Sequence, residues 1–318
     1  MKIKSFLKLV EIQTKVASVI PFLLGLAYTL YNFGKVYALN LVVMFFAMVI
    51  FDMSVTALNN YVDYKKAIKK HGYGYEIHNS IVQNNLKEST VLITIITMML
   101  ISTVLGIYLV LLTNYVVLLL GIICFAIGIV YSYGPIPISR TPFGEIFSGV
   151  TMGFIIPFIT IYINTMDKRI LDLTLSEYTL SGKLYLMPIL GIIVATIPAV
   201  FCIANIMLAN NICDMEDDIE NKRYTLPIFI GKEKSIVLLK ALFYLSYVAI
   251  LLGVALGVLP IYSLLAILTV LLVKKNIKLF AENTTKKDTF ALIVANFLTI
   301  NVPLILSIFV GVVVKMIF

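Results

Sequence analysis

The sequence predicts an all-α protein that crosses a membrane about nine times. Sixty per cent of its 318 residues are hydrophobic and only 13% are charged, a composition typical of polytopic membrane proteins and not of soluble globular ones. The mean hydropathy of +1.00 agrees. The apolar residues also gather in runs of about 20, the length that a helix needs to span a bilayer. We therefore expect one transmembrane domain over residues 1–318.

Charged or turn-forming residues separate the apolar runs and set the limits of the expected helices. Very short hinges between the third and fourth runs, and between the seventh and eighth, predict antiparallel neighbours. The eighth run is short and has Pro260 near its start. The nine runs cover residues 16–34, 36–58, 90–112, 114–133, 144–165, 186–209, 235–257, 259–273 and 289–314.

The net charge of +8 is explained by membrane topology and does not indicate nucleic-acid binding. With the N-terminus in the cytoplasm, about four fifths of the 25 Lys and Arg residues fall on the cytoplasmic side of the expected helices. The positive-inside rule favours that orientation. We therefore expect a multi-pass protein of the plasma membrane with a cytoplasmic N-terminus. The polar connections at about 59–88 and 210–234 then lie on the cytoplasmic side.

Two acidic clusters occupy those connections, each directly after an apolar run. Asn59 and Asp63 are four residues apart, and so are the successive members of the set Asn210, Asp214 and Asp218. On helical backbone this spacing projects each set from one face. Carboxylate and amide oxygens suit Mg²⁺, which in turn can hold a diphosphate. Both clusters lie on the same side of the membrane, which favours one shared site.

The chemistry that such a site favours is ionisation of an allylic diphosphate. Mg²⁺ held by Asp63, Asp214 and Asp218 would stabilise the charge that develops on the departing diphosphate. Lys222 and Arg223 follow the second cluster and could add charge-assisted hydrogen bonds to the phosphate oxygens.

Residues near the first cluster could complete the substrate site. Lys65 can approach the diphosphate from the other side, and the rings of Tyr61 and Tyr131 can shield an allylic cation. Asp52 lies seven residues before Asn59, on the same face and inside an apolar run. An intramembrane carboxylate is a candidate functional residue, and we expect Asp52 to line the pocket of the acceptor substrate.

Three blocks of sequence resemble the UbiA superfamily of intramembrane aromatic prenyltransferases. They are residues 59–66 (NNYVDYKK), 131–145 (YSYGPIPISRTPFGE) and 210–226 (NNICDMEDDIENKRYTL). Within the superfamily the chain is most similar to the 1,4-dihydroxy-2-naphthoate polyprenyltransferases of menaquinone synthesis. The order and spacing of the blocks fit the family over most of the chain.

The resemblance implies nine transmembrane helices around a lipid-open cavity with a cytoplasmic cap. It implies Mg²⁺-dependent transfer of a polyprenyl group to dihydroxynaphthoate with loss of the ring carboxylate, which yields a demethylmenaquinol-type lipid. The matching Mg²⁺–diphosphate ligands are Asn59, Asp63, Asn210, Asp214 and Asp218, and Lys222 and Arg223 match the basic residues after the second motif.

The chain departs from the family pattern mainly around the first motif. It has Asn60 where the family often has an acid, and Ala67 or Lys69 where another acid usually stands. Residues 11–14 read Glu-Ile-Gln-Thr in place of Arg-Pro-x-Thr, and Asp52 stands where amides are common. These departures concern the acceptor and the first metal site.

Other functions remain open from the residues alone. Another acceptor, such as 4-hydroxybenzoate or haem, would leave the reaction class unchanged. A secondary transporter also uses intramembrane acids, but places them near the bilayer midplane, whereas here all but Asp52 lie at helix ends. A phosphatidyl-transferring enzyme needs a denser Asp–Gly/Ala–Arg pattern, which the sequence lacks.

Overall fold

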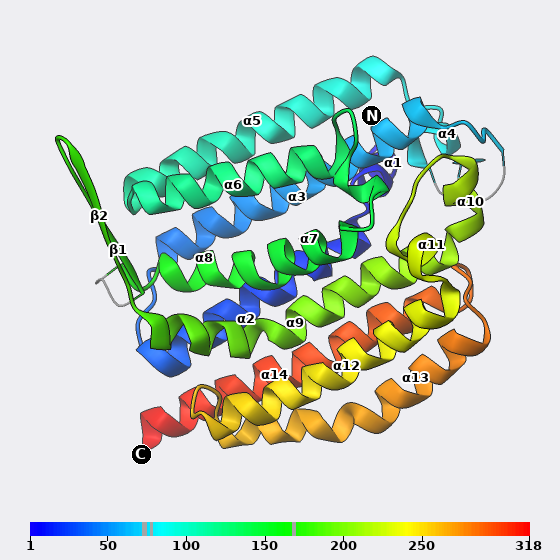
Figure 1. Ribbon diagram of the computed structural model, residues 1–318. Helices are drawn as coiled ribbons and strands as arrows, with labels where there is room; N and C mark the ends of the chain where they lie inside the picture. The colour runs from blue at the N-terminus through cyan, green and yellow to red at the C-terminus, as the bar shows by residue number, and fades with distance from the viewer. Residues whose placement is uncertain (72–74, 77–78, 167–169) are drawn as a thin grey trace.

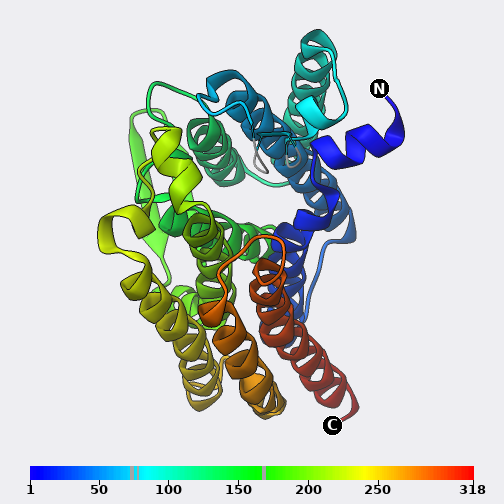
Figure 2. The same ribbon diagram turned by 90° about the vertical axis from the view of Figure 1, so that its right-hand side faces the viewer.

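The computed structural model describes residues 1–71, 75–76, 79–166 and 170–318. Its long helices run up and down in a single bundle (Figure 1). Figure 2 shows the same bundle viewed along its helices. The long elements are α2 (Val16–Phe33), α3 (Ala38–Lys66), α5 (Glu88–Leu112), α6 (Tyr115–Ser132), α7 (Gly144–Val150) continued by η4 (Thr151–Ile155) and α8 (Ile156–Tyr162), α9 (Leu186–Cys213), α12 (Lys232–Ala255), η5 (Ile261–Thr269) continued by α13 (Val270–Glu282), and α14 (Phe290–Ile317).

The prediction of an all-α membrane protein with about nine helices is confirmed. Within the described residues, 8 helical stretches are long and apolar enough to cross a membrane. The remaining predicted run, 259–273, forms η5 and the start of α13, where a 3₁₀ helix continues as an α-helix. The two termini lie at opposite ends of the bundle (Figure 1), as an odd number of crossings requires.

Short elements cover the end of the bundle that carries Asp63, Asp214 and Asp218, which we name the acidic end. They are α1 (Ile3–Leu9), η1 (Ile12–Lys15), α4 (Ser80–Gln83), η3 (Ile138–Arg140), α10 (Met215–Glu220) and α11 (Leu226–Ile230). At the opposite end, β1 (Leu171–Ser176) and β2 (Thr179–Leu184) form an antiparallel hairpin. No element was predicted there, because six-residue strands between two long apolar runs produce only a weak periodic signal.

Two helices extend further than hydropathy predicted. The expected limits of 58 and 209 become Lys66 for α3 and Cys213 for α9, since a helix needs no apolar side chains once it leaves the hydrocarbon layer. Asn59, Asp63 and Asn210 therefore lie on helices and not in loops. Asn59 and Asp63, four residues apart, project from one face of α3 as predicted, and Asn59 Nδ2 lies 3.3 Å from Asp63 Oδ2.

Small residues allow α9 to approach the span formed by α7, η4 and α8 closely. A Cβ atom on Gly153 would lie 2.5 Å from the Cα of Val200, and one on Gly149 would lie 2.8 Å from the Val200 carbonyl oxygen. Close backbone approach at small residues is a common way for membrane helices to pack, because lipid provides no hydrophobic driving force between them. This contact fixes the separation of two spans that both contribute residues to the lining of one cavity.

A buried ion pair attaches the N-terminal segment to α3. Lys15 Nζ lies 2.7 Å from Asp52 Oδ1 and 2.7 Å from Thr56 Oγ1, and Ser18 Oγ donates to Asp52 Oδ2 at 2.7 Å. The side chains of Lys15 and Asp52 are only 6% and 17% exposed. Charges this far from water need a partner, so the pair fixes where the chain enters α2.

Replacement of Gly153 by Ala should destabilise the protein, because the new methyl group overlaps the backbone of α9. We expect a loss of about 1–3 kcal/mol, the usual cost of overpacking. Thermal unfolding in detergent measures the change. Gly106→Ala is the matched control, since no described atom beyond the nearby backbone of its own helix lies within 4 Å of the position that its new methyl group would take. Equal unfolding temperatures for the two variants would contradict this account of the packing.

Removal of one member of the Lys15–Asp52 pair should lower the free energy of unfolding more than removal of both. Lys15→Ala or Asp52→Ala leaves the other charge buried alone, which typically costs about 3–5 kcal/mol. The double variant Lys15→Met/Asp52→Leu restores an uncharged, filled site and should recover most of the loss. The same unfolding assay tests this, and a double variant less stable than either single variant would refute it.

Candidate active site

A cavity of about 1370 Å³ extends from the acidic end into the bundle. Helix α5 gives the direction of the cavity. It begins at the acidic end, where Glu88 pairs with Lys65 at 2.7 Å, and runs away from that end. The far part of the cavity is lined by apolar residues near the end of α5 and the start of α6, such as Leu109 and Val117. Charged residues line the mouth. The cavity thus has a polar mouth and an apolar interior.

The three predicted metal-binding carboxylates meet at this mouth. Asp63 comes from α3, Asp214 follows the last residue of α9, and Asp218 lies on α10. All three line the cavity, as do Asn59 and Asn210. Although the helix breaks at Asp214, the amide of Asp218 still donates to the Asp214 carbonyl at 2.7 Å. The helical spacing that the sequence predicted therefore survives the break.

Arg223 joins the two clusters. Its Nε lies 3.1 Å from Asp218 Oδ1, and its Nη1 lies 3.5 Å from Asp63 Oδ2. Arg140, from the connection between α6 and α7, adds a contact of 3.3 Å to Asp63 Oδ1. Lys286 lies 2.5 Å from Asp214 Oδ2. Each of these three carboxylates therefore has a cationic partner.

Burial changes the titration of the residues at the mouth. It raises the pKa of Asp218 to about 6, although the neighbouring Arg223 favours the charged form. Burial alone would lower the pKa of Arg223, but the carboxylates of Asp63, Asp218 and Asp214 outweigh it, and the net direction is upward. Arg223 therefore keeps its charge in this setting.

The donor set at the mouth fits a hard divalent cation. Aspartate carboxylates and asparagine amides supply the oxygen ligands that Mg²⁺ prefers. Among the described residues, no group of three His, Cys, Asp or Glu side chains is close enough to hold a metal by itself. The carboxylates instead contact Arg223, Arg140 and Lys286 directly. These cations carry the compensating charge that a metal would otherwise supply.

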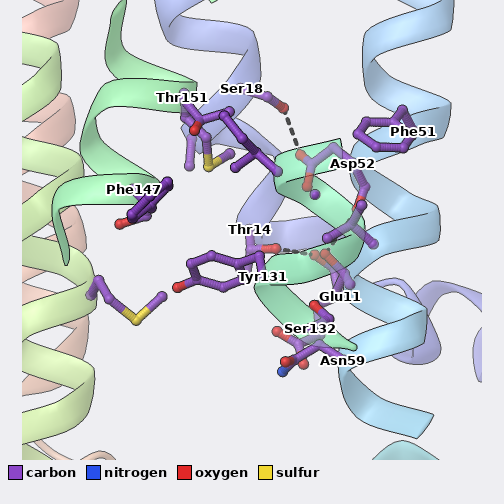
Figure 3. Close-up of a pocket in the computed structure, with 18 of the residues that line it drawn as sticks. Glu11, Thr14, Ser18, Phe51, Asp52, Asn59, Tyr131, Ser132, Phe147 and Thr151 are labelled. Carbon is purple, nitrogen blue, oxygen red and sulfur yellow. Dashed lines mark hydrogen bonds between the residues drawn. The ribbon is translucent and has the colours of Figure 1, made fainter. Parts of the chain in front are cut away.

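Tyr131 projects into the middle of the cavity from the end of α6 (Figure 3). Its hydroxyl is buried and has no hydrogen-bond partner among the described residues. One oxygen of the buried Glu145 carboxylate is similarly unpaired, while the other accepts from Asn211 Nδ2 at 2.9 Å. Buried polar atoms normally find partners, so Tyr131 and Glu145 keep unused hydrogen-bonding capacity beside the cavity.

The N-terminal segment and α3 form the wall opposite α7 (Figure 3). Glu11, Thr14 and Ser18 face the cavity together with Asp52. Asp52 thus lies in the cavity lining, as predicted from its spacing to Asn59, but with its charge neutralised by Lys15. Glu11 Oε1 accepts from Asn60 Nδ2 at 3.0 Å.

Three residues predicted to bind substrate or assist catalysis lie outside the cavity lining. Lys222 is exposed and has a left-handed backbone with φ of 53°. Lys65 pairs with Glu88, and Tyr61 packs against the small apolar cluster around Leu9. They were selected because they lie beside the acidic clusters in the sequence, and that position does not specify which side chains turn toward the cavity.

Three cations of the site had no predicted role. Arg140 lies in the 131–145 block, so its position was available as a signal. Lys69 was noted only as a departure from the family pattern; it lines the cavity and pairs with Asp217 at 2.7 Å and Glu220 at 3.1 Å. Nothing in the sequence distinguishes Lys286 from its neighbour Lys287.

Comparison with known proteins identifies this arrangement. Residues 18–301 match the UbiA prenyltransferase family. The chain is 30% identical, over 235 residues, to the 1,4-dihydroxy-2-naphthoate octaprenyltransferase of Bacillus subtilis (strain 168), and the match covers 74% of this chain and 68% of that protein.

Solved structures share the fold at low sequence identity. A UbiA homolog from Aeropyrum pernix K1 has a TM-score of 0.65 and 18% identity, with 93% of this chain and 98% of that chain covered. A UbiA homolog from Archaeoglobus fulgidus, bound to DMAPP and Mg²⁺, has a TM-score of 0.61 and 14% identity, with 98% and 99% covered.

The family match covers most of the chain, and the relative from B. subtilis supports it over 74% of the chain. The fold and the paired acidic clusters at the cavity mouth agree with both. The chain is a membrane-embedded prenyltransferase of the UbiA family.

Proposed function

We propose that the protein transfers a polyprenyl group from an allylic diphosphate to 1,4-dihydroxy-2-naphthoate, with Mg²⁺ as cofactor. The observation that carries the proposal is the polarity of the cavity: ion-paired carboxylates and guanidinium groups at the mouth, and apolar side chains in the interior. A prenyl diphosphate has the same division between a charged head and an apolar chain. The similarity to the B. subtilis enzyme supports the choice of acceptor.

The mouth would bind the diphosphate. Asp63, Asp214 and Asp218, with Asn59 and Asn210, are the residues that would hold Mg²⁺. The bound metal would neutralise the leaving diphosphate. Arg223 and Arg140 are placed to donate to phosphate oxygens when a divalent cation takes over part of their role at the carboxylates. Lys222, Lys65 and Tyr61 have no place in this arrangement, because they do not line the cavity.

The reaction itself would be an electrophilic aromatic substitution. The bond between the allylic carbon and the diphosphate oxygen breaks, and its electron pair leaves with the diphosphate. A ring carbon of the acceptor then bonds to the allylic carbon. Loss of CO₂ from that carbon returns an electron pair to the ring and restores aromaticity. The rings of Tyr131 and Phe147, which face the cavity, are suited to stabilise the positive charge.

The acceptor would lie against the wall formed by Glu11, Thr14, Ser18 and Asp52. These side chains line the cavity beside Tyr131, so a ring there would be close to the allylic carbon. An electron-rich dihydroxynaphthalene needs little activation, which agrees with a site built from positioning and charge stabilisation.

We also propose that the acidic end faces the cytoplasm in the plasma membrane. The proposal rests on the excess of Lys and Arg around that end of the helices. Water-soluble substrates such as dihydroxynaphthoate would then reach the mouth directly from the cytoplasm.

The acceptor is tested with membranes that contain the protein, Mg²⁺ and a radiolabelled polyprenyl diphosphate. Dihydroxynaphthoate and 4-hydroxybenzoate are offered in parallel, each with and without EDTA. We expect label in an apolar naphthol lipid only with dihydroxynaphthoate and only with free metal. Label in the benzoate product would identify 4-hydroxybenzoate as an acceptor and contradict the proposed one. Labelling that persists in EDTA would refute the role of the metal.

Asp214→Ala and Asp218→Ala should each lower turnover by at least about 100-fold, since each removes a charged ligand on which transition-state stabilisation depends. Glu216→Ala is the matched control, because Glu216 lies in the same segment but is exposed. Turnover is measured together with the amount of folded protein in the membrane. Activity similar to wild type in either Asp variant would contradict the metal-site assignment.

A further inference from the structure

Lys286 is a cation of the site that comes from the C-terminal part of the chain. It lies in the connection between α13 and α14, and its Nζ is 2.5 Å from Asp214 Oδ2. The side chains of Lys286 and Asp214 are each 19% exposed, and both residues line the cavity. The next residue, Lys287, is exposed to solvent and does not line the cavity. Two adjacent lysines therefore point to different surroundings.

The connection that carries Lys286 is closed by its own hydrogen bonds. The amide of Thr285 donates to Thr289 Oγ1 at 3.2 Å, and the amide of Asp288 donates to Thr285 Oγ1 at 3.3 Å. The amide of Thr289 donates to the Thr285 carbonyl at 3.2 Å. These bonds hold the backbone of the turn that carries Lys286 just before α14.

The cationic partners of the three carboxylates at the mouth differ in their chemistry. Asp63 and Asp218 contact guanidinium groups, which are planar and cannot lose their charge, whereas Asp214 contacts a lysine. An ammonium group on a four-carbon chain can change partners with little rearrangement. A divalent cation that binds Asp214 competes with the ammonium for the charge of that carboxylate. An ammonium displaced in this way would remain at the cavity mouth, beside any diphosphate held by the metal.

We propose that Lys286 binds the diphosphate of the prenyl donor, and that it serves as the counter-ion of Asp214 until metal and donor arrive. This inference rests on the proposed function and adds one substrate-binding residue to it. Before binding, the ammonium holds the Asp214 carboxylate in place. After binding, it donates to a phosphate oxygen.

The proposal predicts two effects of opposite sign for Lys286→Gln. Metal binding without diphosphate should become several-fold tighter, because the ammonium no longer competes for Asp214. Binding of the allylic diphosphate in saturating Mg²⁺ should weaken about tenfold, since a charge-assisted hydrogen bond is lost. A residue with only a structural role would not move the two affinities in opposite directions.

The experiment uses the full-length protein in detergent. Mn²⁺ titrated without diphosphate and followed by EPR reports the metal affinity, and equilibrium binding of radiolabelled geranyl diphosphate in excess Mg²⁺ reports the diphosphate affinity. Lys287→Gln is the matched control and should change each affinity by less than about twofold. Lys286→Arg keeps the charge and should retain most of the diphosphate affinity. Unfolding temperatures verify that all variants are folded.

The outcomes separate this proposal from the proposed function. If wild-type protein binds no geranyl diphosphate, the proposed function fails, while the Mn²⁺ titration still decides whether Lys286 is the counter-ion of Asp214. If wild-type protein binds it and Lys286→Gln binds it equally well, the role of Lys286 is overturned and the function is not. A fall in both affinities would also overturn the proposal.

Discussion

The structure of the site depends on Arg223 and the two carboxylates that it joins. Asp63 belongs to α3 and Asp218 to α10, and their distances to Arg223 of 3.5 and 3.1 Å link the two acidic clusters across the cavity mouth. Several carboxylates gathered in a partly buried place repel one another unless cations lie between them. Arg223 is well suited to that position, because its planar guanidinium group can contact two acids and keeps its charge when buried. This contact joins the two halves of the polar mouth.

A charged mouth above an apolar interior also relates the site to its membrane setting. The polar clusters lie where α3 and α9 extend past their apolar runs, while the far part of the cavity lies among apolar side chains such as Leu109 and Val117. Charges are tolerated at the end of a membrane helix and are costly at its centre. An amphiphilic substrate with a charged head and a hydrocarbon chain meets the same two environments in the same order. The division of the cavity therefore follows from the division of the bilayer.

Several departures from the family pattern are matched by a partner in the folded chain. Asn60 donates to Glu11 at 3.0 Å, and Asp52 pairs with Lys15 at 2.7 Å, so the changed N-terminal segment and the changed face of α3 contact each other. Lys69 pairs with Asp217. A sequence read position by position presents these as isolated substitutions around the first motif. In the structure they are contacts that attach the N-terminal segment and the 67–71 segment to the rest of the acidic end.

Hydropathy and spacing predicted the helices and the two carboxylate sets, because these are local properties: an apolar run of sufficient length forms a membrane helix, and residues four apart share a face. The family followed from the resemblance of three sequence blocks. From its spacing to Asn59, the sequence predicted Asp52 in the acceptor pocket, and the structure shows Asp52 in the cavity lining. Only the tertiary structure decided that Lys286 and not Lys287 faces the cavity, that Lys222 and Lys65 lie outside its lining, and that Arg140 contacts Asp63. Those side chains lie in connections or at helix ends, where the direction of each is set by packing between segments distant in sequence.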